Sequence, residues 1–136
     1  MRRTVALAVV MITLVACAST PPRAQRSEFE DIPVPKGLAL DLDKSTIIES
    51  PSVKAARLFY KGRLEPESLG TAFRTTLEAN GWRHLSSTLA SGKGITQVYE
   101  KTGNSLQVHI YEGLFWYTWV EVSATRVVQT GSAQVR

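Results

Sequence analysis

The fold is determined most clearly by residues 65–82, which read EPESLGTAFRTTLEANGW. Pro66 suits the first position of a helix, and the glutamates on either side of it suit the positive end of the helix dipole. Apolar residues then recur at every third or fourth position and form one apolar face. Asn80 and Gly81 supply a left-handed C-cap, and Trp82 follows where such caps place a hydrophobic residue against the last turn. The stretch predicts one amphipathic helix.

Segments of alternating apolar and polar residues predict β-strands on both sides of this helix. Turn residues such as Ser91-Gly92-Lys93-Gly94 separate them by short connections, which favour antiparallel neighbours. The expected strands are 38–42 (an edge strand or extended lead-in), 45–49, 53–61, 83–90, 95–101, 106–111 and 115–125. The fold class is therefore α+β, with an antiparallel sheet of about five or six strands, one helix packed on one face and the order β-β-α-β-β-β-β.

The N-terminus has the pattern of a bacterial lipoprotein signal. Two arginines precede an uninterrupted, mostly apolar run over residues 5–16. This run has about the length of a signal h-region and is well short of the roughly 20 residues that a spanning helix needs. Leu14-Val15-Ala16-Cys17 then resembles a lipobox, in which the thiol is alkylated by diacylglycerol and the signal peptidase cuts before the modified cysteine. We expect residues 1–16 to be the signal peptide and Cys17 to be the acylated N-terminus.

An ordinary secretory signal that is cut elsewhere would leave Cys17 as a stray thiol. Cys17 is the only cysteine of the chain and stands at the one position that a lipobox requires, whereas an unpaired thiol is unusual in an exported protein. The expected partner is a membrane, because two or more acyl chains, at about 0.8 kcal/mol per buried methylene, anchor a protein permanently. Ala18 follows the cysteine. In Gram-negative envelopes the absence of aspartate there favours the outer membrane, with the domain facing the periplasm; a host with a single membrane stays open.

The rest of the chain divides into a tether, one domain and a tail. Residues 17–30 carry the cysteine and a small, polar stretch that cannot bury a core, so they are expected to form a flexible tether. Residues 31–126 have the length of a single domain, and residues 127–136 are expected to be a disordered tail. The chain has 16 basic and 12 acidic residues, and two of the arginines leave with the signal peptide. This balance is not that of a nucleic-acid-binding protein.

Four short motifs stand out in the domain: Pro-x-Pro-x-Gly at 33–37, the strand end Leu-Phe-Tyr at 58–60, the helix start Pro-Glu-Ser at 66–68 and Asn-Gly-Trp at 80–82. Together they resemble a family of small bacterial lipoproteins, whose members combine one helix with a small antiparallel sheet and mostly carry no assigned activity. In many relatives the helix ends in a Phe-Tyr pair and a Met before Asn-Gly-Trp, and here Phe73 and Leu77 fill comparable places.

This resemblance spans about residues 31–112 and consists of fold-determining residues, so it implies an architecture and no chemistry. A more distant similarity is to the helix-grip domains of the lipoprotein subunit of the outer-membrane β-barrel assembly machinery. That similarity is an analogy of size, element order and anchoring.

The domain offers little that predicts catalysis. His84 and His109 are its only histidines, and neither lies at a metal-ligand spacing. Asp41 and Asp43 are placed to share a cation, yet no third ligand accompanies them, so they are better interpreted as solvated charges of an edge strand. His84 has serines nearby, but no acid is positioned by spacing to complete a triad. We expect neither an enzyme nor a cofactor or metal site.

The most unusual feature is the segment from Tyr111 to Trp119, which holds five of the 11 aromatic residues. In the last strand, the even-numbered face from Trp116 to Ala124 is the better core, because it keeps a glutamate and a serine out of the interior. Tyr117 and Trp119 then point away from the helix, beside His109 and Tyr111 on the neighbouring strand. A register error of one residue would exchange the two faces.

Two interpretations of this surface stay open. Cross-strand aromatic pairs can simply stiffen an exposed sheet face, by a few tenths to about 1 kcal/mol for each pair. Alternatively, the aromatic side chains form a contact surface for a partner protein, a sugar polymer or a lipid headgroup. That contact surface consists of Tyr111, Tyr117, Trp119 and His109.

The functional hypothesis is a membrane-anchored, non-enzymatic envelope lipoprotein that docks on another envelope component through this sheet face. The alternative is a small-ligand or lipid binder that uses the groove between the helix and the sheet. The alternative predicts an apolar cavity beside Phe73 and Leu77.

Overall fold

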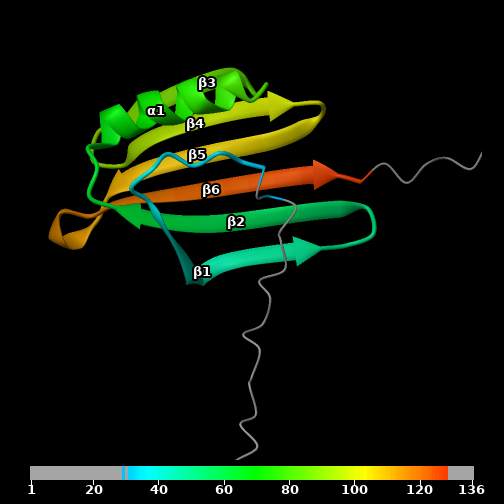
Figure 1. Ribbon diagram of the computed structural model, residues 1–136, viewed down its shortest axis with the longest axis horizontal. Helices are drawn as coiled ribbons and strands as arrows, with labels where there is room; N and C mark the ends of the chain where they lie inside the picture. The colour runs from blue at the N-terminus through cyan, green and yellow to red at the C-terminus, as the bar shows by residue number, and fades with distance from the viewer. Residues whose placement is uncertain (1–28, 30, 129–136) are drawn as a thin grey trace, which may run out of the picture.

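The computed structural model describes residues 29 and 31–128 of the chain. Within this part, six strands form one antiparallel sheet in the order β1-β2-β6-β5-β4-β3, and one α-helix packs on one face of it (Figure 1). The elements are β1 (Ala39–Glu49), β2 (Val53–Gly62), α1 (Pro66–Ala79), β3 (Arg83–Ala90), β4 (Gly94–Lys101), β5 (Asn104–Glu112), the 3-10 turn η1 (Leu114–Trp116) and β6 (Thr118–Val127). The predicted α+β class is confirmed. The predicted signal peptide, Cys17 and most of the tether lie outside the described residues, as does the tail from residue 129.

Local signals at both ends define α1. At its N-terminus the Glu65 carboxylate accepts hydrogen bonds from the backbone N–H groups two and three residues later, at 2.9 and 2.6 Å. At its C-terminus Gly81 has a φ of +85°. The Gly81 N–H donates to the carbonyl oxygen of Glu78 and the Trp82 N–H to that of Leu77, both at 3.0 Å. These are the paired bonds of a Schellman motif, so the predicted left-handed cap is present.

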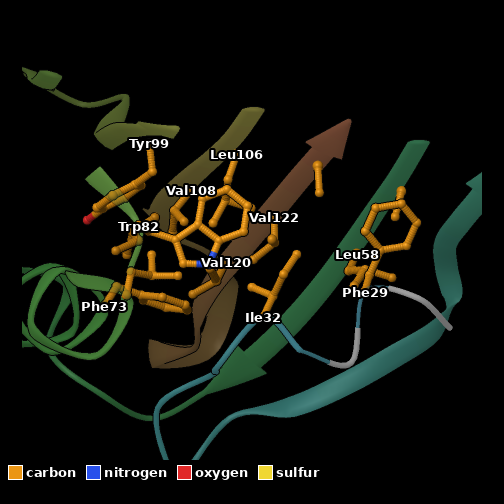
Figure 2. Packing of buried hydrophobic residues seen from close by; sticks show 14 of the residues in the cluster. Phe29, Ile32, Leu58, Phe73, Trp82, Tyr99, Leu106, Val108, Val120 and Val122 are labelled. Atoms are coloured by element: carbon orange, nitrogen blue, oxygen red, sulfur yellow. The ribbon is translucent and has the colours of Figure 1, made fainter. Parts of the chain in front are cut away.

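The core lies between the sheet and two segments that share one of its faces. α1 covers β3, β4 and β5, while residues 31–38 cross the same face over β6 and β2 (Figure 1). Figure 2 shows Phe29 beside Leu58 of β2 and Ile32 near Val122 of β6, and all four side chains are buried. Phe29, which the sequence predicts to be part of the tether, therefore belongs to the core.

A buried polar chain connects α1 to the sheet. The Tyr99 hydroxyl donates to Gln97 Oε1 at 2.8 Å, and Gln97 Nε2 donates to the carbonyl oxygen of Gly70 at 3.1 Å. Both side chains belong to β4 and are buried, and burial raises the pKa of Tyr99 to about 12. Because buried polar groups need partners, this chain fixes the position of the helix on the sheet.

β1 is a single strand with a bulge, whereas the sequence predicts two separate pieces. Its pairing with β2 shifts register between Asp41 and Thr46. The Ser45 hydroxyl donates to the carbonyl oxygen of Asp41 at 2.6 Å and accepts from the Phe59 N–H at 3.0 Å. These hydrogen bonds hold the bulge in place, and the bulge carries Lys44 over the neighbouring strands.

The last strand begins later than the sequence predicts. β6 starts at Thr118, and residues 114–116 form a 3-10 turn. The predicted core face is correct from Thr118 to Ala124, where alternate side chains are buried. Trp116, which was predicted for the same face, is instead 94% exposed. The strand pairing explains this difference. β2 ends at Gly62, which pairs with Thr118. Trp116 stands two residues before Thr118, beyond the end of β2, so β2 does not extend beside it.

Candidate functional site

The sheet face opposite α1, which we call the open face, carries the aromatic side chains that the sequence singles out. On the central strands its residues are Arg57, Phe59 and Lys61 of β2, Trp119, Glu121 and Ser123 of β6, and Gln107, His109 and Tyr111 of β5. Tyr111 lies directly opposite Trp119 in the pairing of β5 with β6. The rings of His109 and Tyr111 are tilted against each other, with centroids 5.1 Å apart. The structure thus brings three of the four predicted surface residues together, and we call them the aromatic cluster.

Tyr117, the fourth predicted surface residue, lies outside the paired strands. It precedes β6, and its hydroxyl accepts a hydrogen bond from Arg63 at 3.4 Å. The guanidinium carbon of Arg63 stands 4.9 Å from the centroid of the Tyr117 ring. Tyr117 therefore pairs with a cation beyond the end of β2 and belongs to the β5–β6 loop.

Trp119 is half-buried because neighbouring groups cover its indole. Lys44 Nζ lies 3.7 Å from the ring centroid, and Lys61 Nζ lies 5.8 Å from it. A Cβ atom added to Gly113 would be only 2.4 Å from Trp119 Cδ1, so the edge of the indole rests directly on the Gly113 backbone. Cation–π contacts of this kind contribute about 0.5–1 kcal/mol at exposed sites. The indole is therefore a fixed part of the open face.

Ion pairs surround the aromatic cluster. Arg57 donates to the Glu121 carboxylate, and this hydrogen bond raises the pKa of Arg57. Lys61 Nζ lies 3.8 Å from the carboxylate of Asp41, which engages one of the two aspartates considered above as cation ligands. Burial, and then the charge of Glu121, raises the pKa of Tyr111. Its phenol is neutral at physiological pH and can donate a hydrogen bond to a partner.

A second surface feature is the end of the β5–β6 hairpin. Leu114, Phe115 and Trp116, which we call the hairpin tip, are 81%, 80% and 94% exposed, more than any other large hydrophobic side chain of the described residues. Phe115 and Trp116 have φ angles of 61° and 62°, a region that costs a bulky L-residue about 1–2 kcal/mol. The Gly113 N–H donates to the carbonyl oxygen of Tyr117 at 2.8 Å and closes the loop. The chain thus holds three apolar side chains in solvent on a strained backbone.

Sequence reasoning missed the hairpin tip because alternation does not mark where a strand begins. The available signal was the run of three large apolar residues from Leu114 to Trp116, which breaks the alternation that continues from Thr118 onward. Consecutive apolar residues that face solvent serve no purpose in a strand and usually mark a functional surface.

The space directly beneath α1 is filled, although an open groove of about 470 Å³ lies along its side, between α1 and strands β3 and β4. Phe73 and Leu77 are completely buried within the core cluster, so side chains occupy the place where the ligand-binding alternative requires a cavity. A groove of about 570 Å³ lies beside the hairpin tip, lined by residues 63–66 and 112–118. A second groove, of about 670 Å³, is lined by the start of α1, the β3–β4 turn and the end of β5. Both open at the same end of the sheet as the hairpin tip.

The described residues contain no group of three or more His, Cys, Asp or Glu side chains that could hold a metal ion. His84 Nε2 lies 2.8 Å from the Ser87 hydroxyl, and the His84 ring meets Tyr99 edge-on at 5.3 Å between centroids. This histidine is therefore engaged in packing beside α1. In the part of the chain that the structure describes, no helix has both the length and the apolar character needed to cross a membrane.

Comparisons with protein-family models, curated proteins and solved structures found no match to this chain. The resemblance to small bacterial lipoproteins therefore stays a prediction.

Proposed function

We propose that this protein is a non-enzymatic lipoprotein of the bacterial cell envelope, which is anchored in a membrane by acylated Cys17 and docks on another envelope protein through its open face. The lipobox residues 14–17 and the position of the only cysteine support the anchor. Ala18 supports the outer membrane as its location, with the domain in the periplasm.

The aromatic cluster carries the docking part of the proposal. It lies on a sheet face opposite both α1 and the N-terminal segment. Tyrosine, tryptophan and arginine contribute most of the binding energy at protein interfaces. Tyr111 and Trp119 lie opposite each other here, and Arg57 is on the same face, paired with Glu121. Their cross-strand and ionic contacts hold them before a partner arrives, so little side-chain entropy is lost on binding. A small ligand would instead need a concave site.

The anchor is tested by replacing the cysteine. The wild-type chain is expected to incorporate labelled palmitate and to float with membranes in a density gradient, whereas Cys17→Ser does neither. Equal flotation of the two chains would contradict the anchor.

The docking surface is tested by photo-crosslinking in intact cells. A crosslinking amino acid in place of Tyr111 is expected to capture one protein, while the same amino acid in place of Thr75, which is exposed on α1, captures none. Adding Trp119→Ser should remove the Tyr111 product without changing the circular dichroism spectrum. A product that forms equally well from position 75, or survives Trp119→Ser, would overturn docking through the open face.

A further inference from the structure

The hairpin tip has a chemistry that docking through the open face leaves unexplained. Leu114, Phe115 and Trp116 project into solvent, and directly behind them Tyr117 is in contact with the guanidinium of Arg63. This order of groups suits the boundary between lipid tails and headgroups. The apolar side chains come first, then an aromatic ring, and then a cation. The composition of the tip therefore matches a lipid–water interface.

The shape of the hairpin tip favours a membrane over a protein. The loop that carries it extends beyond the end of the sheet, at the left of Figure 1, and its three side chains are exposed. A protein partner would have to provide a pocket shaped to three large side chains, whereas a fluid interface accepts a convex apolar tip without a matching surface. Tryptophan and phenylalanine are also enriched where proteins meet the membrane interface.

The chain is long enough to bring the hairpin tip back to the membrane. Asp31 and Phe29 contact Arg126 near the end of β6, whereas the tip precedes the first residue of this strand (Figure 1). The length of β6 separates these two points by about 30 Å. Cys17 and Phe29 are 12 residues apart in the sequence, and such a segment spans at most about 40 Å. Both ends of the sheet can therefore be held at one membrane.

We infer that the hairpin tip is a second, reversible membrane contact, which places Leu114, Phe115 and Trp116 in the interface of the same membrane that holds Cys17. This inference rests on the proposed lipid anchor. Because the anchor keeps the domain at the membrane, insertion of the tip is intramolecular and proceeds at a high effective concentration, so three side chains suffice.

The experiment uses the acylated full chain, reconstituted into vesicles of phosphatidylethanolamine and phosphatidylglycerol that contain lipids brominated along their acyl chains. Bromine quenches tryptophan emission only at short range. Trp82 is buried and Trp119 is covered by Lys44 and Gly113, so the quenched emission is expected to come from Trp116. Trp116→Phe keeps the tip apolar and should abolish the quenching.

A charged variant and a matched control measure the contribution of the tip. Phe115→Asp should lower the ratio of inserted to free tip by at least about tenfold, and the fold tolerates it because Phe115 is exposed and aspartate accepts a positive φ more readily. Ile48→Asp adds the same charge at an isoleucine that is 62% exposed on the edge strand β1. Ile48 pairs with Ala55, which pairs with Thr125, so it lies at the end of the sheet opposite the hairpin tip. Ile48→Asp should leave the quenching unchanged.

Each outcome decides one proposal. A wild-type chain that floats with vesicles, while Trp116 stays unquenched and accessible to aqueous iodide, overturns the membrane contact and leaves the anchor intact. Capture of a protein by a crosslinker at position 116 in cells, combined with absence of quenching, assigns the tip to a protein partner instead. Failure of the wild-type chain to float overturns the anchor, and this inference with it.

Discussion

Replacing Gly113 by alanine is expected to displace the indole of Trp119 and to destabilise the protein for that reason alone. Gly113 has φ −108° and ψ −171°, a conformation that alanine adopts without strain. A Cβ atom at this position would lie 2.4 Å from Trp119 Cδ1 and 2.6 Å from Nε1, well inside van der Waals contact. Lys44 Nζ stands 3.7 Å over the same ring, so the indole has to leave this cation as it tilts away.

The magnitude follows from three contributions. Overpacking at a site that can partly relax costs about 1–3 kcal/mol, and loss of the contact between Lys44 and Trp119 costs about 0.5–1 kcal/mol. Alanine recovers about 0.4–1 kcal/mol, because it restricts the unfolded chain. The free energy of unfolding is therefore expected to fall by about 2 kcal/mol.

Urea denaturation followed by far-ultraviolet circular dichroism measures this change without relying on tryptophan emission. In a Trp119→Ala background the clash is gone, and Gly113→Ala should be neutral or slightly stabilising. An equal loss of stability in both backgrounds would refute the assignment to Trp119. Gly103→Ala is the control, because Gly103 has φ +77° and open space around it; its cost is conformational and should be the same in both backgrounds.

Two further predictions follow from the hairpin tip and the buried polar chain. Trp116→Gly should raise the free energy of unfolding by up to about 1 kcal/mol, because it relieves a positive φ at an exposed residue. The same change should remove the quenching by brominated lipid. A lower free energy of unfolding in urea denaturation would show instead that the tip packs on the domain. Tyr99→Phe leaves buried Gln97 Oε1 without its donor and should cost about 1–2 kcal/mol at neutral pH. Because burial raises the pKa of Tyr99 to about 12, the folded state retains a proton that an unfolded tyrosine releases from about pH 10. The contribution of Tyr99 to the free energy of unfolding is thus fully present below pH 10 and is lost as the pH rises through 12, by about 1.4 kcal/mol per pH unit. In urea denaturation at a series of pH values, the free energy of unfolding of Tyr99→Phe should fall less steeply with pH than that of the wild type.

The elements that the sequence predicts well are those determined by their own residues. Pro66 and Gly81 mark the ends of α1 through capping, which involves only adjacent residues. Alternation likewise predicts that Val120 and Val122 face the core, and that Tyr111 lies near Trp119 on the opposite face. These features depend on local conformation or on a period of two.

The elements that the sequence misses depend on distant residues. The start of β6 is set by the end of β2 at Gly62, 56 positions earlier in the chain than Thr118, and alternation carries no information about that end. The cover on Trp119 comes from Lys44, which reaches the ring because a bulge held by Ser45 interrupts β1. The aromatic cluster could therefore be predicted as a group of residues, whereas its partial burial could not. The hairpin tip is marked in the sequence only by the run of apolar residues from Leu114 to Trp116.

The two proposed membrane attachments together restrict the partner of the open face. With the hairpin tip inserted, the tether can return to Phe29 near the far end of β6, about 30 Å from the tip. Tyr111 lies only three residues before the tip, which places this end of the aromatic cluster within about 10 Å of the inserted tip. A partner that reaches the cluster must then itself lie at the membrane. Docking and insertion are thereby coupled, so Phe115→Asp, which changes no residue of the open face, should also reduce the crosslinking from position 111.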